Sequence, residues 1–397
     1  MPYYLRHHFE PDFDYMHLKP KADDAGNIDR YNLGYVQNVV KGQVLAELVP
    51  LEEAGEGPLD PRYVYDAPPA ELPCGPNCDV DPGSPNRVVA DANGYVFYHD
   101  GLITVKKMLN VRRDVDFHTG NIFFVGDMAI HADVKPGFEI QADNILIKGV
   151  VEGAVVRARG AIACESGIKG GKGCLLDAGD TLRVPFAETA ELRSHGNMYI
   201  ERFALHCRIY AGANLVVKDR VQGGTVHGAG VVYIENQLGG AQGTPTKVNL
   251  GYDPFKFRKI TRLEENIRDL RQRIIHYEAV AADTPAGKEE PVRRLEAALK
   301  KMDRLLRQRA ALWEDLKRGG PIAERCRLVV PGRIMPGVEI SIEESWMEVR
   351  EELRDVRIVL RDGELAVESP ALPPSHGASH GASHGASHGA SHGPSQR

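Results

Sequence analysis

The sequence has no apolar run that approaches the roughly 20 residues needed for a membrane-spanning helix. Its amino terminus, residues 1–8, is polar and charged, and it does not resemble a secretory signal peptide. Basic residues are not in excess, since the formal net charge is -6, and an acidic chain offers no overall surface for nucleic acid. These absences predict a cytoplasmic protein with no membrane span and no nucleic-acid partner.

Cysteine is scarce, with six scattered residues among 397. The cysteines in the middle of the chain stand at core-like positions, so we expect reduced thiols rather than disulfides. Cys74 and Cys78 are separated by three residues and lack a second cysteine pair or a nearby histidine, which would make only half of a zinc site. We interpret them as thiols in a Pro-rich loop, and the sequence predicts no cofactor.

A repeat between about Gly120 and Gly251 is the strongest pattern in the chain. Roughly every 16 to 20 residues, a Gly, Asp or Asn is followed by two apolar residues two positions apart. Both side chains of such a pair point the same way out of a strand. Corners such as Ala178-Gly179-Asp180 are expected to supply left-handed or tight backbone. The pairs are Ile145 and Ile147, Ile162 and Cys164, Leu182 and Val184, Met198 and Ile200, Leu215 and Val217, and Val232 and Ile234.

One coil of this kind cannot bury its own apolar face, so successive coils must stack. The repeat therefore predicts a mainly β fold built on a parallel β-helix. Strand-like segments from residue 87 onward are expected to lead into the repeat, which places the β-helix at 87–255. Residues 1–86 are expected to form a small β-rich cap and a Pro-rich linker.

The apolar period changes at Pro254 to a heptad pattern. Helix breakers at 283–287 divide this segment into two helices, so residues 256–319 should form an antiparallel coiled-coil hairpin, here called the arm. The arm should project roughly 35 to 45 Å from the body. Residues 256–318 carry 17 Lys and Arg against 11 Asp and Glu, so the arm is the basic part of an acidic molecule. The predicted seam comprises Ile260, Leu263, Ile267, Leu270, Ile274 and Tyr277, then Val292, Leu295, Leu299, Met302, Leu306, Trp313 and Leu316.

Strand patterns return at 320–368, which should dock on the end of the β-helix and cover its open edge. The hairpin is then an insertion. Residues 369–397 repeat Ser-His-Gly-Ala and are expected to be disordered. Neutral imidazoles can bind Ni²⁺, Cu²⁺ or Zn²⁺, but a solvated tail is the preferred interpretation. The candidate metal ligands in it are His376, His380, His384, His388 and His392.

Two further patterns suggest chemistry. Residues 167–173 contain four glycines and two lysines, but they lack the spacing and the following helix of a phosphate loop, so a corner of the β-helix explains them better. Carboxylates at corners, Asp177 with Asp180 and Glu188 with Glu191, could serve a polysaccharide-cleaving enzyme. Solvated corners explain these carboxylates better.

Several blocks resemble the bacterial flagellar assembly protein A family. They are residues 116–126, 149–154, 239–251 and 336–340, together with the hairpin between the last two. The likeness covers about 87–365, and the amino-terminal region looks shorter than that of the family. The resemblance implies a right-handed β-helix interrupted by a coiled coil, in a cytoplasmic protein without established catalytic activity. It also implies a link to flagellar assembly or placement.

The leading hypothesis is a non-enzymatic scaffold whose arm docks an acidic protein partner. The alternative is a β-helix protein that binds or cleaves a polysaccharide. Self-association through the ends of the β-helix is a third possibility. The residues expected to bind the partner are Arg262, Arg268, Arg271, Arg273, Arg293, Arg294, Lys300, Lys301 and Arg304.

Overall fold

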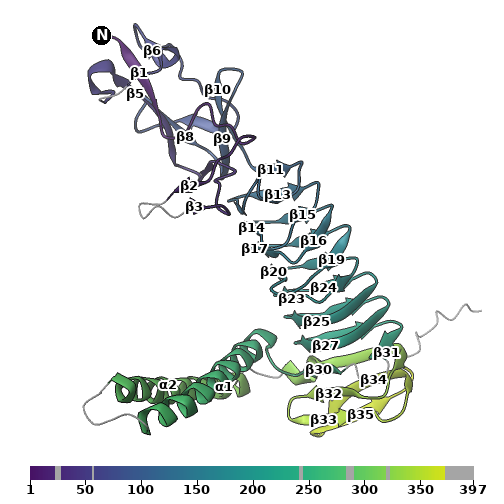
Figure 1. The fold of residues 1–397 in the computed structure, drawn as a ribbon. Coiled ribbons are helices and arrows are strands. Elements are labelled where there is room, and N and C mark those ends of the chain that lie inside the picture. The colour runs from purple at the N-terminus through teal and green to yellow at the C-terminus, as the bar shows by residue number, and fades with distance from the viewer. Residues whose placement is uncertain (23–27, 56–57, 241–244, 283–289, 319–321, 372–397) are drawn as a thin grey trace, which may run out of the picture.

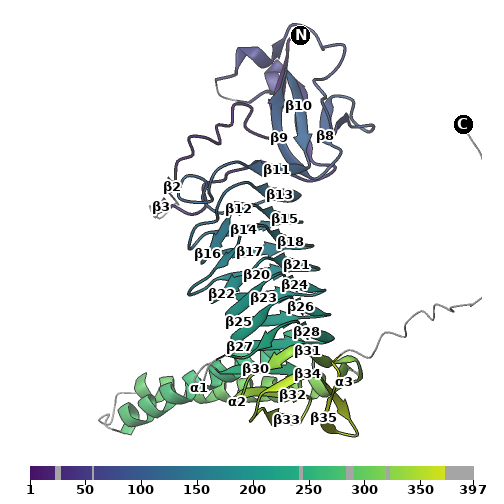
Figure 2. The same ribbon diagram turned by 90° about the vertical axis from the view of Figure 1, so that its right-hand side faces the viewer.

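The computed structural model describes residues 1–22, 28–55, 58–240, 245–282, 290–318 and 322–371. The molecule is elongated, with a small β unit at the N-terminal end, a stack of coils in the middle and two helices that project sideways from the far end (Figure 1). The view at 90° shows the coils stacked one above another along the rod (Figure 2). None of the described helices is long and apolar enough to cross a membrane.

The stack is a parallel β-solenoid of about eight turns, with three strand faces. The first face contains β11 (Met108–Val111), β13 (Asp127–Ile130), β15 (Ile145–Ile147), β18 (Ile162–Cys164), β21 (Leu182–Val184), β24 (Met198–Ile200), β26 (Leu215–Val217) and β28 (Val231–Ile234). The second face contains β16 (Val150–Glu152), β19 (Gly167–Lys169), β22 (Ala187–Glu188) and β29 (Gln237–Leu238). The third face contains β12 (Ile122–Phe123), β14 (Glu139–Ala142), β17 (Val155–Ala158), β20 (Leu175–Ala178), β23 (Glu191–Ser194), β30 (Thr246–Leu250) and β32 (Val338–Ile342).

Three longer strands run around a corner. β25 (Phe203–Ala211) and β27 (Arg220–Gly228) each serve the second and third faces. β31 (Arg327–Ile334) serves the first and second faces, because it pairs with both β28 and β29.

The apolar pairs of the repeat form the first face of the core. Ile145 stands in register with Ile162, which stands in register with Leu182. Every residue of the six pairs is buried, with at most 5% of its surface exposed. The predicted parallel β-helix is therefore confirmed, and its right hand stays a prediction.

Glycine is needed at the corners because space is short there. The sequence predicted left-handed or tight backbone at the corners, and Gly179 and Gly212 do not have the positive φ of the left-handed form. A Cβ on Gly179 would lie 2.0 Å from the carbonyl oxygen of Arg159, and one on Gly212 would lie 2.3 Å from that of His195. These glycines are needed because adjacent coils approach closely at the corner.

Asparagine side chains tie one coil to the next. Asn144 Oδ1 accepts a hydrogen bond from the backbone of Ala161 at 2.8 Å. Asn197 Oδ1 accepts from the backbone of Asn214, and Asn214 Oδ1 accepts in turn from that of Val231. Each bond satisfies a backbone N–H at a corner or at the first residue of the strand that follows it.

The N-terminal unit has its own core around Leu5, Leu45, Val88 and Ile103. Its strands are β1 (Tyr3–His7), β2 (Lys21–Ala22), β3 (Ile28–Asp29), β4 (Asn38–Val39), β5 (Val44–Pro50), β6 (Val64–Tyr65), β7 (Cys78–Val80), β8 (Arg87–Ala90), β9 (Gly94–His99) and β10 (Leu102–Lys106), with short 3₁₀ turns at Leu51–Glu53 and Pro61–Tyr63. β8 pairs with β5 and β7, and β9 pairs with β4 and β10. The expectation that the strands from residue 87 lead into the repeat was therefore wrong for β8 to β10, because their partners lie in this unit.

Both ends of the solenoid are covered. At the first coil, Tyr35 is buried in the solenoid core, and Asn38 Nδ2 donates to the carbonyl of Phe123 at 2.7 Å. At the last coil, α3 (Ile322–Arg325) precedes β31, β33 (Ser345–Glu348) pairs antiparallel with β32, and β34 (Leu353–Arg361) pairs antiparallel with β31 and with β35 (Glu364–Glu368). Antiparallel partners at the last coil break the parallel ladder, so a further coil cannot simply continue it.

The arm consists of α1 (Pro254–Ala282) and α2 (Glu290–Lys317), inserted between β30 and β31. At about 1.5 Å per residue, the 29 residues of α1 span roughly 43 Å. The helices pack together through Leu270, Ile274 and Ala298, supported by Leu295, Met302, Leu305 and Tyr277. Val292 and Leu299 are 44% and 46% exposed, so the predicted seam was wrong for these two residues of α2. The predicted turn at 283–287 lies outside the described residues.

Candidate interaction surface

The arm begins just after β30, and the last parallel coil, formed by β31 and β32, follows it in the chain. Asp253 caps α1, because its Oδ1 accepts hydrogen bonds from the backbone N–H groups of Phe255 and Lys256 at 2.8 and 3.1 Å. Phe255 then stacks on His195 of the solenoid, with ring centroids 3.8 Å apart and planes 3° apart. The first turn of the helix is thereby fixed against the third face.

A row of aromatic rings continues this contact. Tyr210 and His227 stack on neighbouring coils at 4.9 Å, and Phe257 of α1 lies 5.0 Å from His227. Trp313 of α2 meets the edge of Phe257 at 6.2 Å. Burial lowers the pKa of His227 to about 4, so this ring is neutral near pH 7 and packs as an aromatic group.

Glu191 of β23 connects the arm to the solenoid electrostatically. Its carboxylate accepts from Arg258 Nε at 2.6 Å and from Arg193 Nε at 2.7 Å, and it pairs with Arg208 at 3.2 Å. The side chains of Glu191, Arg193 and Arg258 are only 12%, 13% and 20% exposed. Burial by itself raises the pKa of Glu191, but the hydrogen bonds from Arg258 and Arg193 outweigh it and hold the pKa below its usual value.

We call Phe255, Phe257, Arg258 and Trp313 the arm base. Their contacts with His195, His227 and Glu191 fix both the position and the direction of the arm. Arg258 is one of the 17 basic residues of the arm, and its contact with Glu191 holds the arm in place.

A groove of about 430 Å³ runs between α1 and the third face. We call it the basic groove, since five arginines and two glutamates line it. The lining residues are Val155, Arg157, Gly173, Cys174, Leu175, Glu191, Arg193, Arg208, Tyr210, Arg258, Thr261, Arg262 and Glu265. Arg157 is paired with Glu139, and Arg193 also bonds Asp177 at 2.8 Å. Arg208 is 62% exposed, so its guanidinium keeps donors open to an incoming acidic group.

All nine residues expected to bind a partner are exposed. Arg262 lines the basic groove, whereas the other eight lie farther out along the arm. Arg268 and Arg271 are three residues apart on α1, and Lys300 and Arg304 are four apart on α2, so each pair shares a helix face. Arg294 forms an exposed i, i+4 pair with Glu290 at 2.9 Å.

A second hollow of about 570 Å³ lies on the arm itself, near the arm base. Leu263, Ala311 and Leu312 form its apolar wall, and Lys259 and Arg262 stand at its edge. Because Arg262 lines both this hollow and the basic groove, basic side chains extend from the groove onto the arm.

The phosphate-loop pattern at 167–173 is a corner of the solenoid. A Cβ on Gly167 would lie 2.3 Å from the ring of Phe186, and one on Gly170 would lie 2.4 Å from the carbonyl oxygen of Thr189. These glycines are required by packing against the next coil.

The carboxylates considered for polysaccharide cleavage are partly used in ion pairs, since Asp177 and Glu191 both bond Arg193. Every resolved pKa shift of a carboxyl group in the described residues is downward, as for Asp133 and Glu191. A glycosidase needs one carboxyl group with a raised pKa as its acid. The described residues therefore give the cleavage hypothesis no support.

Cys74 and Cys78 are free and half-buried. Burial raises the pKa of Cys78 to about 11, so its thiol stays protonated near neutral pH. No group of three His, Cys, Asp or Glu that could hold a metal occurs in the described part of the chain. The candidate ligands His376, His380, His384, His388 and His392 lie outside it.

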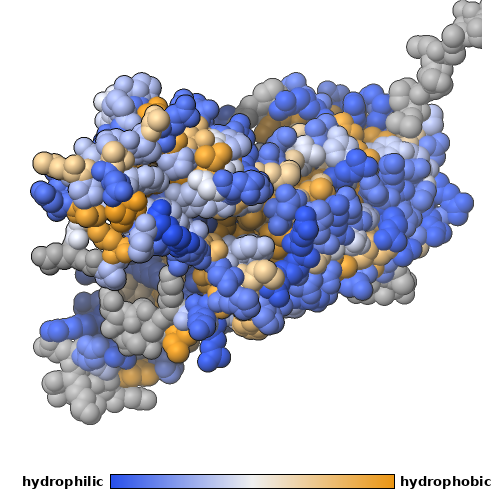
Figure 3. Space-filling model, turned by 90° about the horizontal axis from the view of Figure 1, so that it is seen from above, coloured by the Kyte–Doolittle hydropathy of each residue, from blue (hydrophilic) through white to orange (hydrophobic). Residues whose placement is uncertain are grey.

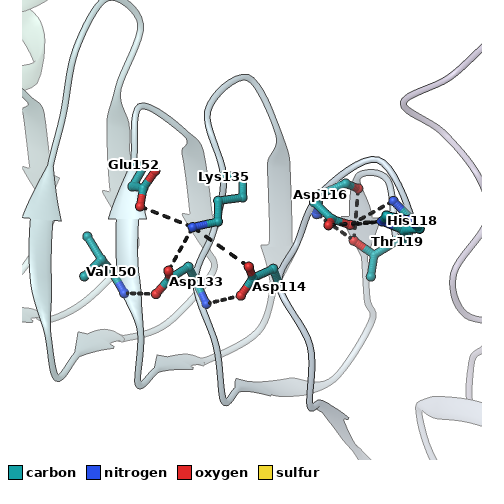
Figure 4. A network of polar contacts seen from close by, with 8 residues as sticks. All are labelled: Asp114, Asp116, His118, Thr119, Asp133, Lys135, Val150 and Glu152. Atoms are coloured by element: carbon teal, nitrogen blue, oxygen red, sulfur yellow. Dashed lines mark hydrogen bonds and ion pairs between the residues drawn. The ribbon is translucent and has the colours of Figure 1, made fainter.

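Sequence reasoning missed a polar cluster on the first coils (Figure 4). Lys135 Nζ lies 2.9 Å from Asp133, 3.3 Å from Glu152 and 3.9 Å from Asp114. Asp133 also accepts from the backbone N–H of Val150 at 2.8 Å. The ammonium group occupies the centre of the three carboxylates, so the cluster links coils rather than offering an open site. The spacing of Asp114 and Asp133, 19 residues or one coil apart, was the available signal.

Family comparison bears on this architecture. A model of the Flagellar Assembly Protein A beta solenoid domain matches residues 107–365. The chain belongs to the flagellar assembly protein A family. A model of the Flagellar Assembly Protein A N-terminal region matches residues 4–101, so the amino-terminal region keeps the family pattern over most of its length. Neither the comparison with curated proteins nor that with solved structures found a match.

Proposed function

We propose that the protein is a non-enzymatic scaffold in flagellar assembly or placement, and that its arm docks an acidic protein partner in the cytoplasm. Family membership supports the flagellar setting. The observation that carries the docking role is the basic arm held rigidly away from an acidic body. Residues 256–318 carry 17 Lys and Arg against 11 Asp and Glu, within a chain of net charge -6.

The arm is built for exposure rather than for stability. From residue 260 onward, most side chains of the two described helices are not buried. The buried ones are Ile260, Ile267, Leu270, Ile274, Ala298 and Leu316. Complementary charge steers a partner and suppresses wrong ones more than it adds affinity. A positive surface on a fixed support therefore suits selection of an acidic partner.

The surface of the rest of the molecule bears on the polysaccharide hypothesis. In the view from above, hydrophilic side chains cover most of the visible face, with apolar residues scattered among them (Figure 3). The polysaccharide hypothesis needs titratable groups that converge in a groove along such a face. The basic groove instead has five arginines against two glutamates in its lining, and Arg208 is 62% exposed, which suits an acidic ligand.

The test is cross-linking in cells followed by mass spectrometry. Residues 268–304 are replaced by a short Gly-Ser loop, which removes the distal basic residues but keeps Arg258, Arg262 and Trp313. The proposal predicts that specific partners recovered with the intact chain disappear with this variant. The control is Arg183→Glu, on the outward side of β21, with Lys218→Glu, directly after β26, and it should recover the same partners. An unchanged partner list after truncation, or no specific partner of the intact chain, overturns the proposal.

A further inference from the structure

A second cleft at the root of the arm differs in chemistry from the basic groove. Its volume is about 540 Å³, and it shares no lining residue with the groove. It lies between the ends of the two helices and the last coils. The lining residues are Asn249, Tyr252, Phe257, Ala310, Trp313, Glu314, Lys317, Ser341, Glu343 and Glu344. We call it the aromatic cleft.

Three rings form one wall of the aromatic cleft. Tyr252 stacks on Phe257 with centroids 6.3 Å apart and planes at 16°, and Trp313 meets Phe257 nearly at a right angle, at 86°. All three rings are half-buried, so each keeps surface that a ligand can contact.

Trp346 extends this wall. It is 69% exposed, the largest exposure among the tryptophan, tyrosine and phenylalanine residues whose side chains are described as exposed. It stands directly opposite Ser341 in the antiparallel pair of β32 and β33. Directly paired residues project from the same side of a sheet, and Ser341 lines the cleft. An exposed tryptophan beside a concave site is a common binding hot spot.

The other side of the aromatic cleft is acidic. Glu343 and Glu344 form the turn between β32 and β33, and Glu314 comes from α2. Lys317 is the one lysine or arginine in the lining, and its Nζ lies 3.3 Å from Glu344. Burial first, and then the negative charges of Glu344 and Glu343, raise the pKa of Tyr252. Three carboxylates against one ammonium leave a net negative cleft.

We propose that the aromatic cleft binds an arginine or lysine side chain from a segment of a protein partner. A cation over an aromatic face is stabilised by the ring quadrupole, and carboxylates supply charge-assisted hydrogen bonds to its N–H groups. Lys317 already places an ammonium group beside Glu344, so the site accommodates a positive charge. The inference is independent of the arm's role with acidic partners, because the two surfaces share no residue and select opposite charges.

The two tryptophans of the chain, Trp313 and Trp346, make the test direct. One lines the cleft and the other extends its wall, so tryptophan fluorescence of the full chain reports on this site. The probe is a capped hexa-arginine peptide, titrated against a hexa-citrulline peptide that has nearly the same shape but no charge. The expected result is a saturable change in emission with hexa-arginine and none with hexa-citrulline.

Two double variants with the same change in net charge test the location. Glu343→Gln with Glu344→Gln should weaken hexa-arginine binding at least 10-fold, whereas Glu165→Gln with Glu235→Gln on exposed solenoid corners should leave it unchanged. Trp346→Leu, at a surface position where folding is not at risk, should weaken binding several-fold. Equal affinity in both double variants, or equal binding of hexa-citrulline, overturns the proposal. So does a fluorescence response to neutral cellohexaose in place of hexa-arginine, which would make the cleft a sugar site.

Discussion

The solenoid and the arm solve the burial of apolar surface in different ways. In the solenoid, residues such as Ile168, Leu192 and Ile209 are completely buried in one continuous core. In the arm, Leu270, Ile274 and Ala298 form a separate and much smaller seam. Stacking of the coils restricts which residue types can occupy the inward and corner positions of the solenoid. Most positions of the arm are exposed, so packing does not restrict their residue types. Surface residues of the arm can therefore be substituted without loss of the fold, and a docking element requires this freedom.

The largest effect should come from the solenoid core. Leu192→Ala removes a side chain with no exposed surface, and the cavity should lower the free energy of unfolding by about 2 to 5 kcal/mol. Leu270→Ala in the arm should instead increase hydrogen exchange in α1 and α2 and leave the solenoid amides protected. Denaturant unfolding followed by circular dichroism measures the first effect. Equal global losses from both substitutions would show that arm and solenoid unfold as one unit.

The second prediction concerns how stability depends on pH through His227, one of the aromatic rings between the solenoid and the arm. The pKa of His227 is about 4 in the folded state, against 6.5 for the ordinary group. The unfolded chain therefore takes up the proton first, so stability is lost as pH falls from about 6.5 and the loss is complete below about 4. At about 1.4 kcal/mol per pKa unit, the loss is on the order of 3 kcal/mol.

His227→Phe keeps an aromatic ring without the titration and should reduce the slope of stability against pH in that range. His7 titrates in the same window, with a pKa lowered to about 4 by burial and by neighbouring His8, so His7→Phe serves as a matched comparison in the N-terminal unit. Thermal melting from pH 7 to pH 4 measures both slopes. A His227→Phe slope identical to that of the native chain would contradict the account.

The third prediction concerns a substitution that should weaken the attachment of the arm to the solenoid without disturbing the solenoid core. Glu191→Gln removes the negative charge that pairs with Arg193 and Arg258, both mostly buried. Because the remaining guanidinium groups then face one another, the junction should lose about 1 to 3 kcal/mol. Hydrogen exchange should rise in the first turns of α1 before it rises in the coils. Asp303→Asn, which removes an exposed pair with Arg307, should leave stability nearly unchanged, because exposed ion pairs contribute little.

The smallest effect should come from the asparagine side chains that link one coil to the next at the corners. Asn214→Ala removes the hydrogen bond to the backbone N–H of Val231 and the one from its own side chain to Asn197. Exposed corners can be rehydrated, so the loss should be about 0.5 to 1.5 kcal/mol in denaturant unfolding. Asn266→Ala on the exposed surface of the arm is the control. A loss above about 3 kcal/mol would contradict the expectation that these exposed hydrogen bonds add little to stability.

The solenoid was predictable from the sequence because the stacking of coils requires a short apolar pattern in each coil. Ile145 and Ile147 must both face inward in a coil, so the period-two pair is visible without knowledge of its neighbours. The seam on α2 was predicted less well. Ala298 is buried while larger Leu299 is exposed, because a small residue lets the helices approach closely at that point.

The arm base and the aromatic cleft could not be predicted in the same way. Glu191 and Arg258 are 67 residues apart, and nothing local distinguishes this glutamate from other corner carboxylates. Trp346 joins Tyr252 and Trp313 only after the chain has completed the arm and returned to the last coil. Sites formed by such distant segments depend on where the arm is inserted in the chain and on the angle at which it packs against the solenoid. The sequence pattern located the insertion but did not predict the angle.

The most direct test of the central claim reverses the charge of the arm without shortening it. Arg268, Arg271, Lys300 and Lys301 are all exposed, so their replacement by glutamate should leave the circular dichroism spectrum and melting temperature nearly unchanged. Cross-linking in cells followed by mass spectrometry should then lose the partners that the native chain recovers. If the folded, charge-reversed protein recovers the same partners in the same amounts, the arm is not the docking surface and the account is wrong.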